Sequence, residues 1–101
     1  MHPIYHITSE VEARAAAESG TYAPRQFDVE GFIHCSYRHQ LGDVANRRFR
    51  GRSGLVLLEI DRTRLACEVV DENLEGGTEL FPHVYGRLPM AAVLSIQPFS
   101  A

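Results

Sequence analysis

The sequence predicts an α+β fold with mostly antiparallel strands and two helices, in a single domain over residues 1–101. Three observations support this class. Both helix-like segments fall in the first half of the chain, whereas the second half is mostly strand-like. The later strand-like segments follow one another too closely for crossover helices, which favours antiparallel pairing. A length of 101 residues is typical of one domain.

The first strand is expected at residues 4–8, and the first helix directly after it. Ser9 and Glu12 have the spacing of a capping box, and residues 11–19 are rich in strong helix formers. Gly20 can end this helix in a left-handed conformation. The segment between Gly20 and the next strand contains a proline and has no clear period, so we expect a loop there.

A second strand is expected at residues 31–36 and a second helix at residues 38–49. In the strand, which reads GFIHCS, alternation puts Phe32, His34 and Ser36 on one face. In the helix, apolar residues recur at intervals of three and four positions. A glycine-containing segment then ends this helix.

The second half of the chain contains the most apolar strand. Leu55–Ile60 reads LVLLEI, which is typical of a strand buried on both faces. Residues 80–86 are expected to be irregular or a short strand, because Pro82 cannot donate a hydrogen bond in a central ladder. The remaining segments are a turn at 61–65, a short strand at 66–70, a polar loop or hairpin tip at 71–79 and a closing strand at 91–99.

Composition and charge exclude several classes of protein. The formal charge of −3 is mild, and the absence of a basic stripe argues against a long nucleic-acid partner. The one dense basic segment, Arg47–Arg52, could contact a phosphate group, but it is more typical of the solvated end of a helix. No apolar run has the length of a membrane span, so no membrane partner is expected.

The N-terminal residues lack the pattern of a signal peptide, which predicts a cytoplasmic location. The two cysteines, Cys35 and Cys67, are 32 positions apart, a spacing typical of neither a zinc ribbon nor a dense disulfide framework. We therefore expect two free thiols in a reducing compartment.

Three of the five histidines lie in the strand-like segments. His6 shares its expected face with Ile4 and Thr8, His34 shares its face with Ser36, and His83 precedes Tyr85 by two positions. If these strands pack side by side, their polar faces meet in one cleft. The sequence therefore predicts a histidine-lined cleft with hydroxyl groups beside the imidazole rings. The alternative is that each histidine is a core residue satisfied by backbone partners.

Three kinds of chemistry compete for such a cleft. The three histidines with a carboxylate could bind zinc or iron, but no two of them form an HxH or HxxxH pair, and no metal ligand is assigned. Ser36 or Cys35 could act as a nucleophile, but the serine lacks a glycine-rich elbow and Cys35 faces away from His34 in a regular strand. The third possibility is a nucleotide or sugar pocket, in which Glu72 or Glu79 supplies a carboxylate. For Glu79, a solvated loop charge is the favoured interpretation.

Four segments together resemble the bacterial family known as domain of unknown function 952. These segments are IYHIT, GFIHCS followed by Gln40, LVLLEID, and LFPHVYG preceded by a glutamate and two glycines. The likeness extends from Ile4 to about Val93. The family pattern often has a tryptophan in the first helix, where this chain has Val11 or Ala15. That difference suggests only a local change in packing.

The resemblance implies a fold similar to that of the ADP-ribosyltransferases, with a split pair of mostly antiparallel sheets and NAD in the cleft between them. It implies that His6 holds a ribose of NAD and that Glu72 is the catalytic glutamate, with His83 as a possible substitute. The aromatic residue that stacks on nicotinamide is replaced here by His-Cys-Ser, so His34 or Ser36 would take its place.

The expectation is therefore a protein that binds or processes NAD or a related nucleotide, with NAD as a possible substrate rather than a bound cofactor. An enzyme would be a glycosyltransferase of the ADP-ribosyl type. The alternative is a non-catalytic module that binds a small ligand or a metal. The expected site divides into catalytic residues and ligand-binding residues: Glu72, His83 and His34 in the first group, and His6, Thr8, Ser36 and Tyr85 in the second.

Overall fold

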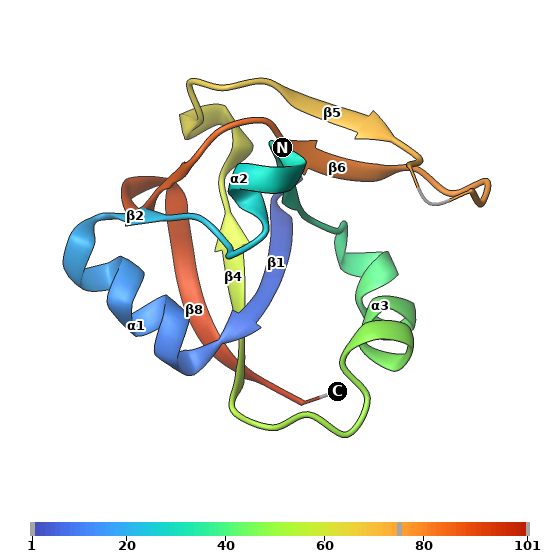
Figure 1. Ribbon diagram of the computed structural model, residues 1–101, viewed down its shortest axis with the longest axis horizontal. Coiled ribbons are helices and arrows are strands. Elements are labelled where there is room, and N and C mark those ends of the chain that lie inside the picture. Colours follow the sequence, from blue (N-terminus) through green and yellow to red (C-terminus); the bar gives the residue numbers. More distant parts are fainter. Residues whose placement is uncertain (1, 75, 101) are drawn as a thin grey trace.

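The computed structural model describes residues 2–74 and 76–100, and it has an α+β fold with antiparallel sheets (Figure 1). One three-stranded sheet has the order β1-β4-β8, another has the order β3-β6-β5, and β2 pairs with β7. The strands are β1 (Ile4–Ser9), β2 (Thr21–Tyr22), β3 (Ile33–His34), β4 (Leu55–Ile60), β5 (Val69–Glu72), β6 (Phe81–Val84), β7 (Leu88–Pro89) and β8 (Val93–Phe99). The α-helices are α1 (Glu10–Ser19), α2 (Phe27–Glu30) and α3 (Leu41–Arg48).

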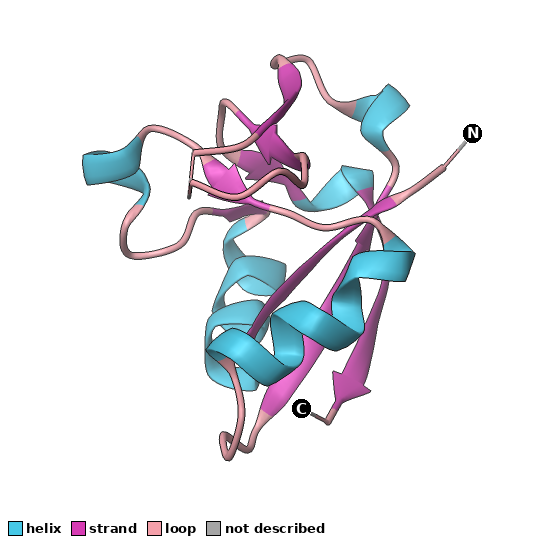
Figure 2. Ribbon diagram, turned by 90° about the vertical axis from the view of Figure 1, so that its right-hand side faces the viewer, coloured by secondary structure: helices cyan, strands magenta, loops and turns pink. Residues whose placement is uncertain are grey.

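Strands β1 and β4 are buried on both faces because α1 and α3 cover opposite sides of the β1-β4-β8 sheet, whereas β8 at its edge is largely exposed (Figures 1 and 2). On the α1 side, Val56, Leu58 and Ile60 of β4 pack with Ile4 of β1. On the α3 side, Tyr5 and Ile7 of β1 and Leu55 and Leu57 of β4 pack in a cluster with Leu41. The alternation of β1 and β4 therefore divides the core into two apolar clusters, and the expectation that Leu55–Ile60 is buried on both faces is confirmed.

The two larger sheets are joined at one point, immediately after β3. Tyr5 of β1 and Ser36 form an isolated antiparallel bridge, in which each backbone N–H donates to the other residue's carbonyl at 2.8 Å. The Cys35 N–H donates to the carbonyl of Pro82 in β6 at 3.1 Å. Residues 35 and 36 therefore pass from one sheet to the other, and they place His34 next to β1.

Local signals set both ends of α1, as expected. Ser9 Oγ accepts a hydrogen bond from the Glu12 backbone N–H at 3.1 Å, which satisfies one of the free donors of the first turn. Gly20 has φ of +90° and its N–H donates to the Ala16 carbonyl. A residue with a Cβ is strained at this φ, so glycine makes this helix end favourable.

Some boundaries differ from the expected ones, because tertiary contacts decide them. The segment expected to be a loop contains α2, a single helical turn ended by Gly31 at φ of +81°. The second strand keeps regular pairing only at Ile33–His34, and the short strand expected at 66–70 is β5, displaced toward the C-terminus. Glu72, expected in a polar loop, lies in β5 and pairs with Phe81 of β6. Pairing across the hairpin satisfies the backbone there despite the polar sequence.

Of the two alternatives for residues 80–86, the short strand is present, and Pro82 is paired within it. It lies in β6, the middle strand of the β3-β6-β5 sheet, where its carbonyl accepts a hydrogen bond from the Cys35 N–H.

The described part of the chain contains no helix with the length and apolar character needed to cross a membrane.

The close approach of Gly86 to Cys67 provides a test of the packing. A Cβ added at Gly86 would lie 2.7 Å from the Cys67 Cβ and 2.9 Å from its Sγ. We therefore expect Gly86→Ala to lower the free energy of unfolding by about 1–3 kcal/mol, as overpacking does. Urea denaturation followed by circular dichroism measures this change.

Gly42→Ala is the matched control, because a Cβ at Gly42 in α3 has no described atom within 4 Å other than its chain neighbours and the backbone of its own helix. This variant should be as stable as the parent protein or more stable by up to about 1 kcal/mol. Equal stability of the Gly86→Ala variant and the parent would contradict the packing described here.

Candidate functional site

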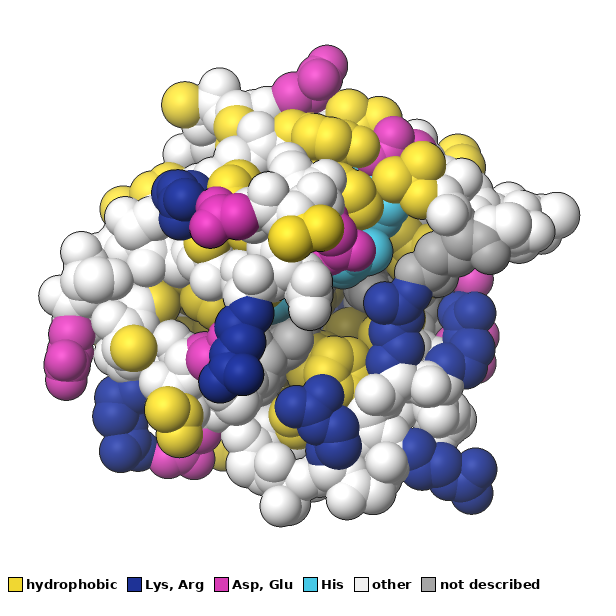
Figure 3. Space-filling model, in the orientation of Figure 1, with side chains coloured by type: hydrophobic (Ala, Val, Ile, Leu, Met, Phe, Trp, Pro, Cys, Tyr) yellow, Lys and Arg dark blue, Asp and Glu magenta, His cyan; other side chains and the backbone are white. Residues whose placement is uncertain are grey.

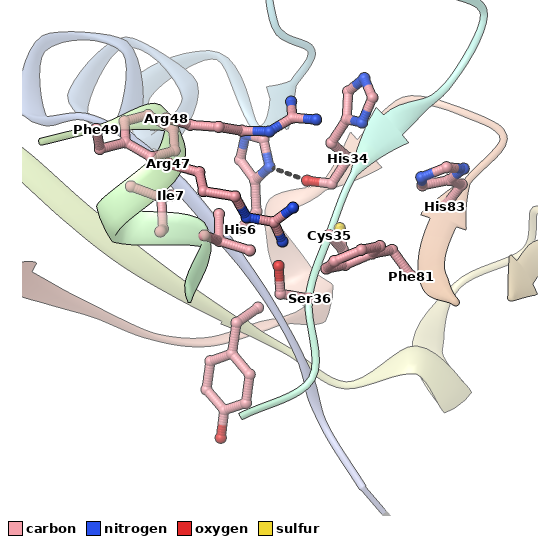
Figure 4. Close-up of a pocket in the computed structure, with 12 residues that line it drawn as sticks. His6, Ile7, His34, Cys35, Ser36, Arg47, Arg48, Phe49, Phe81 and His83 are labelled. Carbon is pink, nitrogen blue, oxygen red and sulfur yellow. Dashed lines mark hydrogen bonds between the residues drawn. The ribbon is translucent and has the colours of Figure 1, made fainter. Parts of the chain in front are cut away.

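A small pocket lies between α3, β1 and the end of β3 (Figure 4). Its volume is about 70 Å³, well below the roughly 300–1,000 Å³ of pockets that hold a drug-sized ligand. It therefore suits a small polar group or one end of a larger ligand. We call it the histidine–arginine pocket; its lining includes His6, His34, Ser36, Arg47, Arg48, Phe81 and His83.

His6 forms a fixed wall of this pocket, because both ring nitrogens are already hydrogen-bonded. Its Nδ1 lies 2.6 Å from the carbonyl oxygen of His34, and its Nε2 lies 2.8 Å from the hydroxyl of Tyr22. The Tyr22 hydroxyl also lies 3.0 Å from Thr8 Oγ1. The carbonyl can only accept, so Nδ1 carries the proton and donates to it.

The protonation state of His6 follows from its burial. The side chain is almost inaccessible to solvent, and desolvation lowers the pKa of His6 to about 4. The ring is therefore neutral near pH 7, Nε2 accepts from the Tyr22 hydroxyl, and Thr8 completes the chain by donating to the Tyr22 oxygen. Burial also raises the pKa of Tyr22 to about 12, so its proton is retained.

His34 presents its side chain on the opposite side of its strand from the buried Ile33 and Cys35. Its Nε2 lies 3.1 Å from a carboxylate oxygen of Glu30 in α2, and about one third of the side chain is exposed. The ring also contacts Phe32 and His83, with centroid distances of 4.8 and 5.2 Å. His34 is therefore oriented by its neighbours yet accessible to a ligand.

His83 is the buried partner of a carboxylate. Its Nδ1 donates to Glu72 at 2.9 Å, and Tyr85 donates a hydrogen bond to the same carboxylate oxygen. Both hydrogen bonds lower the pKa of Glu72; the bond from Tyr85 has the larger effect and the bond from His83 the next largest. Phe32 stacks on the His83 ring at 4.4 Å. Glu72 is thus an ionised group that holds the orientation of His83.

Arg47 is a pocket residue that sequence reasoning missed. Figure 4 shows its side chain extending from α3 toward His34 and Ser36, with the Ser36 hydroxyl facing the guanidinium. Among the residues that the structure describes, Arg47 forms no ion pair. Histidine and basic side chains are also visible near one another on this face of the molecule (Figure 3). The available signal was the basic segment Arg47–Arg52, which was interpreted as a solvated helix end.

The predicted site residues are arranged in two connected groups. Four of them line the pocket, namely His6, His34, Ser36 and His83. The others support these four: Thr8 reaches His6 through Tyr22, while Glu72 accepts hydrogen bonds from both His83 and Tyr85.

Glu79 lies outside this group of residues. Its carboxylate accepts a hydrogen bond at 3.0 Å from the side chain of Gln40, which also donates to the Leu80 carbonyl. Glu79 therefore helps to fix its own loop rather than the pocket.

The metal and nucleophile hypotheses find little support in the geometry. Within residues 2–74 and 76–100, no group of three histidine, cysteine or acidic side chains is arranged to hold a metal ion. Cys35 and Cys67 are free cysteines, as expected. Burial raises the pKa of the Cys35 thiol, which keeps it protonated and poorly reactive.

Comparisons with known proteins concern the family and the fold of the chain. A family model described as "Protein of unknown function (DUF952)" matches residues 7–96. The crystal structure of protein CC0527 from Caulobacter crescentus is 32% identical, with a TM-score of 0.85 over 97% of this chain and 86% of that one. Its solution NMR structure is 33% identical, with a TM-score of 0.84 over 99% and 86%. No curated protein matches the chain significantly. The further likeness to ADP-ribosyltransferases is not supported by these structures and stays a prediction.

The buried state of His6 predicts a pH dependence of stability. Because the folded-state pKa lies near 4 and an exposed imidazole titrates near 6.5, the unfolded chain binds the proton more tightly. The stabilisation is fully present above pH 6.5 and is lost as the pH falls toward 4, by about 3 kcal/mol in total. Urea denaturation at a series of pH values should show a smaller loss for His6→Gln than for the parent.

His39→Gln is the control, because His39 is exposed and should leave this pH dependence unchanged. NMR titration of the parent protein tests the same point without a variant. A His6 ring signal that titrates near pH 6.5 would refute the assignment of a buried, neutral ring.

Proposed function

The chain belongs to the DUF952 family, and we propose that its histidine–arginine pocket binds NAD or a related nucleotide. The observation that carries this proposal is that His34, Ser36, His83 and Arg47 all line the histidine–arginine pocket. Imidazole and hydroxyl groups suit ribose oxygens, and a guanidinium suits a phosphate group. The small volume of the pocket means that it would hold only a phosphate or ribose part of the ligand.

Each group has a distinct role in this proposal. Arg47 would pair with a phosphate, while His34 and Ser36 would bond to oxygen atoms of the ligand. His83 keeps Nε2 for the ligand because its Nδ1 is committed to Glu72. His6 would contribute mainly by shaping the wall, since both of its nitrogens are used within the protein.

A reaction of the ADP-ribosyltransferase type is the more specific form of the proposal. Loss of nicotinamide from NAD develops positive charge on the ribose, and a nearby anion lowers the energy of that transition state. Glu72 suits this task because its lowered pKa keeps it ionised. His83 and His34 would position the ribose against it.

The second candidate is a module that binds the same kind of ligand without turnover. The favouring observation is that Glu72 meets His83 and Tyr85 rather than lining the pocket itself. In that case the carboxylate fixes the orientation of His83 and takes no part in chemistry.

Isothermal titration calorimetry with NAD and with ADP-ribose tests the proposal. Arg47→Gln and His34→Ala should each weaken binding by about tenfold or more, which corresponds to about 1.4 kcal/mol. Arg52→Gln is the matched control, because Arg52 lies in the same basic segment but does not itself line the pocket; its guanidinium lies over the ring of Phe49. Its affinity should equal that of the parent.

Two further measurements separate the candidates. Release of nicotinamide from NAD, lost in Glu72→Gln while binding persists, supports the enzyme; binding without release supports the module. Titration with zinc examines the metal alternative. Absence of NAD and ADP-ribose binding at millimolar concentration, or equal weakening by Arg52→Gln, would refute the nucleotide proposal.

A further inference from the structure

A second and larger hollow lies beside the start of β1. We call it the aromatic–arginine hollow; its lining includes Pro3, Tyr5, Tyr37, Arg38, His39 and Arg62. Its volume is about 900 Å³, which is within the range of pockets that hold small organic ligands. Of these residues, only Tyr5 also lines the histidine–arginine pocket.

Two guanidinium groups of this hollow are held in place by tyrosine hydroxyls. Arg38 Nη2 donates to the hydroxyl of Tyr5 at 2.7 Å, and the guanidinium lies 4.9 Å from the centre of the Tyr5 ring. Arg62 Nη1 donates to the hydroxyl of Tyr37 at 2.8 Å. In the described part of the chain, neither arginine forms an ion pair. Each guanidinium is therefore positioned while its charge lacks a carboxylate in direct contact.

The same two tyrosine hydroxyls also bond to carboxylates. The Tyr5 hydroxyl lies 3.3 Å from Glu59, and the Tyr37 hydroxyl lies 2.6 Å from Asp71. Each phenol accepts from an arginine and donates to an acid, so it separates the two charges. Neither Glu59 nor Asp71 lines the hollow. An anion that enters the hollow therefore meets the guanidinium groups first.

Aromatic rings form another wall of the hollow. The Tyr37 and His39 rings are parallel to within 3°, with their centres 6.2 Å apart. Parallel rings of this kind offer an aromatic face on which a further planar ring can stack. Proline and tyrosine carbon atoms make much of the remaining lining apolar. The hollow thus combines a flat aromatic surface with two fixed cations.

We infer that the aromatic–arginine hollow is a second ligand site, which binds a nucleoside monophosphate. The base would stack on Tyr37 and His39, and the phosphate would pair with Arg38 and Arg62. Guanidinium groups bind phosphate through paired, charge-assisted hydrogen bonds. This site is independent of the function proposed for the histidine–arginine pocket, since the two share only one lining residue.

An NMR titration of the ¹⁵N-labelled protein with adenosine monophosphate tests the inference. The expected result is saturable shifts of the backbone amides of Tyr37, Arg38, His39 and Arg62. Adenosine alone and inorganic phosphate alone should each bind at least about tenfold more weakly, because each lacks one of the two recognised parts.

Substitutions then assign the shifts to this hollow. Arg62→Gln and Arg38→Gln should each weaken adenosine monophosphate binding about tenfold or more. His39→Ala should also weaken it, and its exposed position leaves folding intact if Arg38→Gln is unstable. Arg25→Gln is the control and should bind as the parent does, because Arg25 is an exposed arginine that lines neither cavity.

Three results would overturn the inference: no shifts at millimolar nucleotide, shifts confined to the residues around Ser36 and Arg47, or unchanged affinity in both arginine variants. Nucleotide binding at the histidine–arginine pocket shifts the amides around Ser36 and Arg47, whereas binding at the aromatic–arginine hollow shifts those of Tyr37, His39 and Arg62, so the two proposals fail separately.

Discussion

A buried imidazole must have both nitrogens hydrogen-bonded, and the His6 ring meets this requirement by joining all three sheets. His6 belongs to β1, its Nδ1 partner is the carbonyl of His34 in β3, and its Nε2 partner is Tyr22 in β2. Leaving either nitrogen unsatisfied in the interior would cost about 1–3 kcal/mol. The relative position of the sheets is therefore set by a polar contact as well as by apolar packing.

That contact also decides which side chains face the pocket. Because the His34 carbonyl is turned toward His6, the ring of His34 is left beside Phe32, Glu30 and His83. The adjacent Tyr5–Ser36 bridge then holds the serine against β1. Three histidines that look equivalent in the sequence have different environments: His6 is neutral and enclosed, His83 is clamped to a carboxylate, and His34 is partly exposed.

The distribution of charge matters more than its total. The net charge is −3, yet both hollows have arginine side chains in their walls. All ten basic residues are arginine, whose guanidinium stays charged at any physiological pH and presents a rigid set of donors. An acidic protein can therefore offer locally cationic pockets, provided that its carboxylates are bonded elsewhere, as Glu72 is to His83 and Tyr85.

By itself, the sequence determined the features that depend on neighbours a few positions apart. The alternation of residues in a strand predicts which side chains of Leu55–Ile60 share a face, and the Ser9 and Gly20 caps predict where α1 begins and ends. Both features depend only on residues a few positions apart. Alternation also separated His34 from the buried Cys35. The α+β class followed from the order of these elements.

Only the tertiary structure decided which distant groups meet. Arg47 reaches the pocket because α3 packs on the sheet beside Ser36, and the basic segment gave no sign of this direction. Glu72 became part of a strand because β6 pairs with it, and His6 is neutral because burial removes its ring from water and so lowers its pKa. Desolvation and charge pairing depend on distances in space, and the spacing of residues along the chain does not specify those distances.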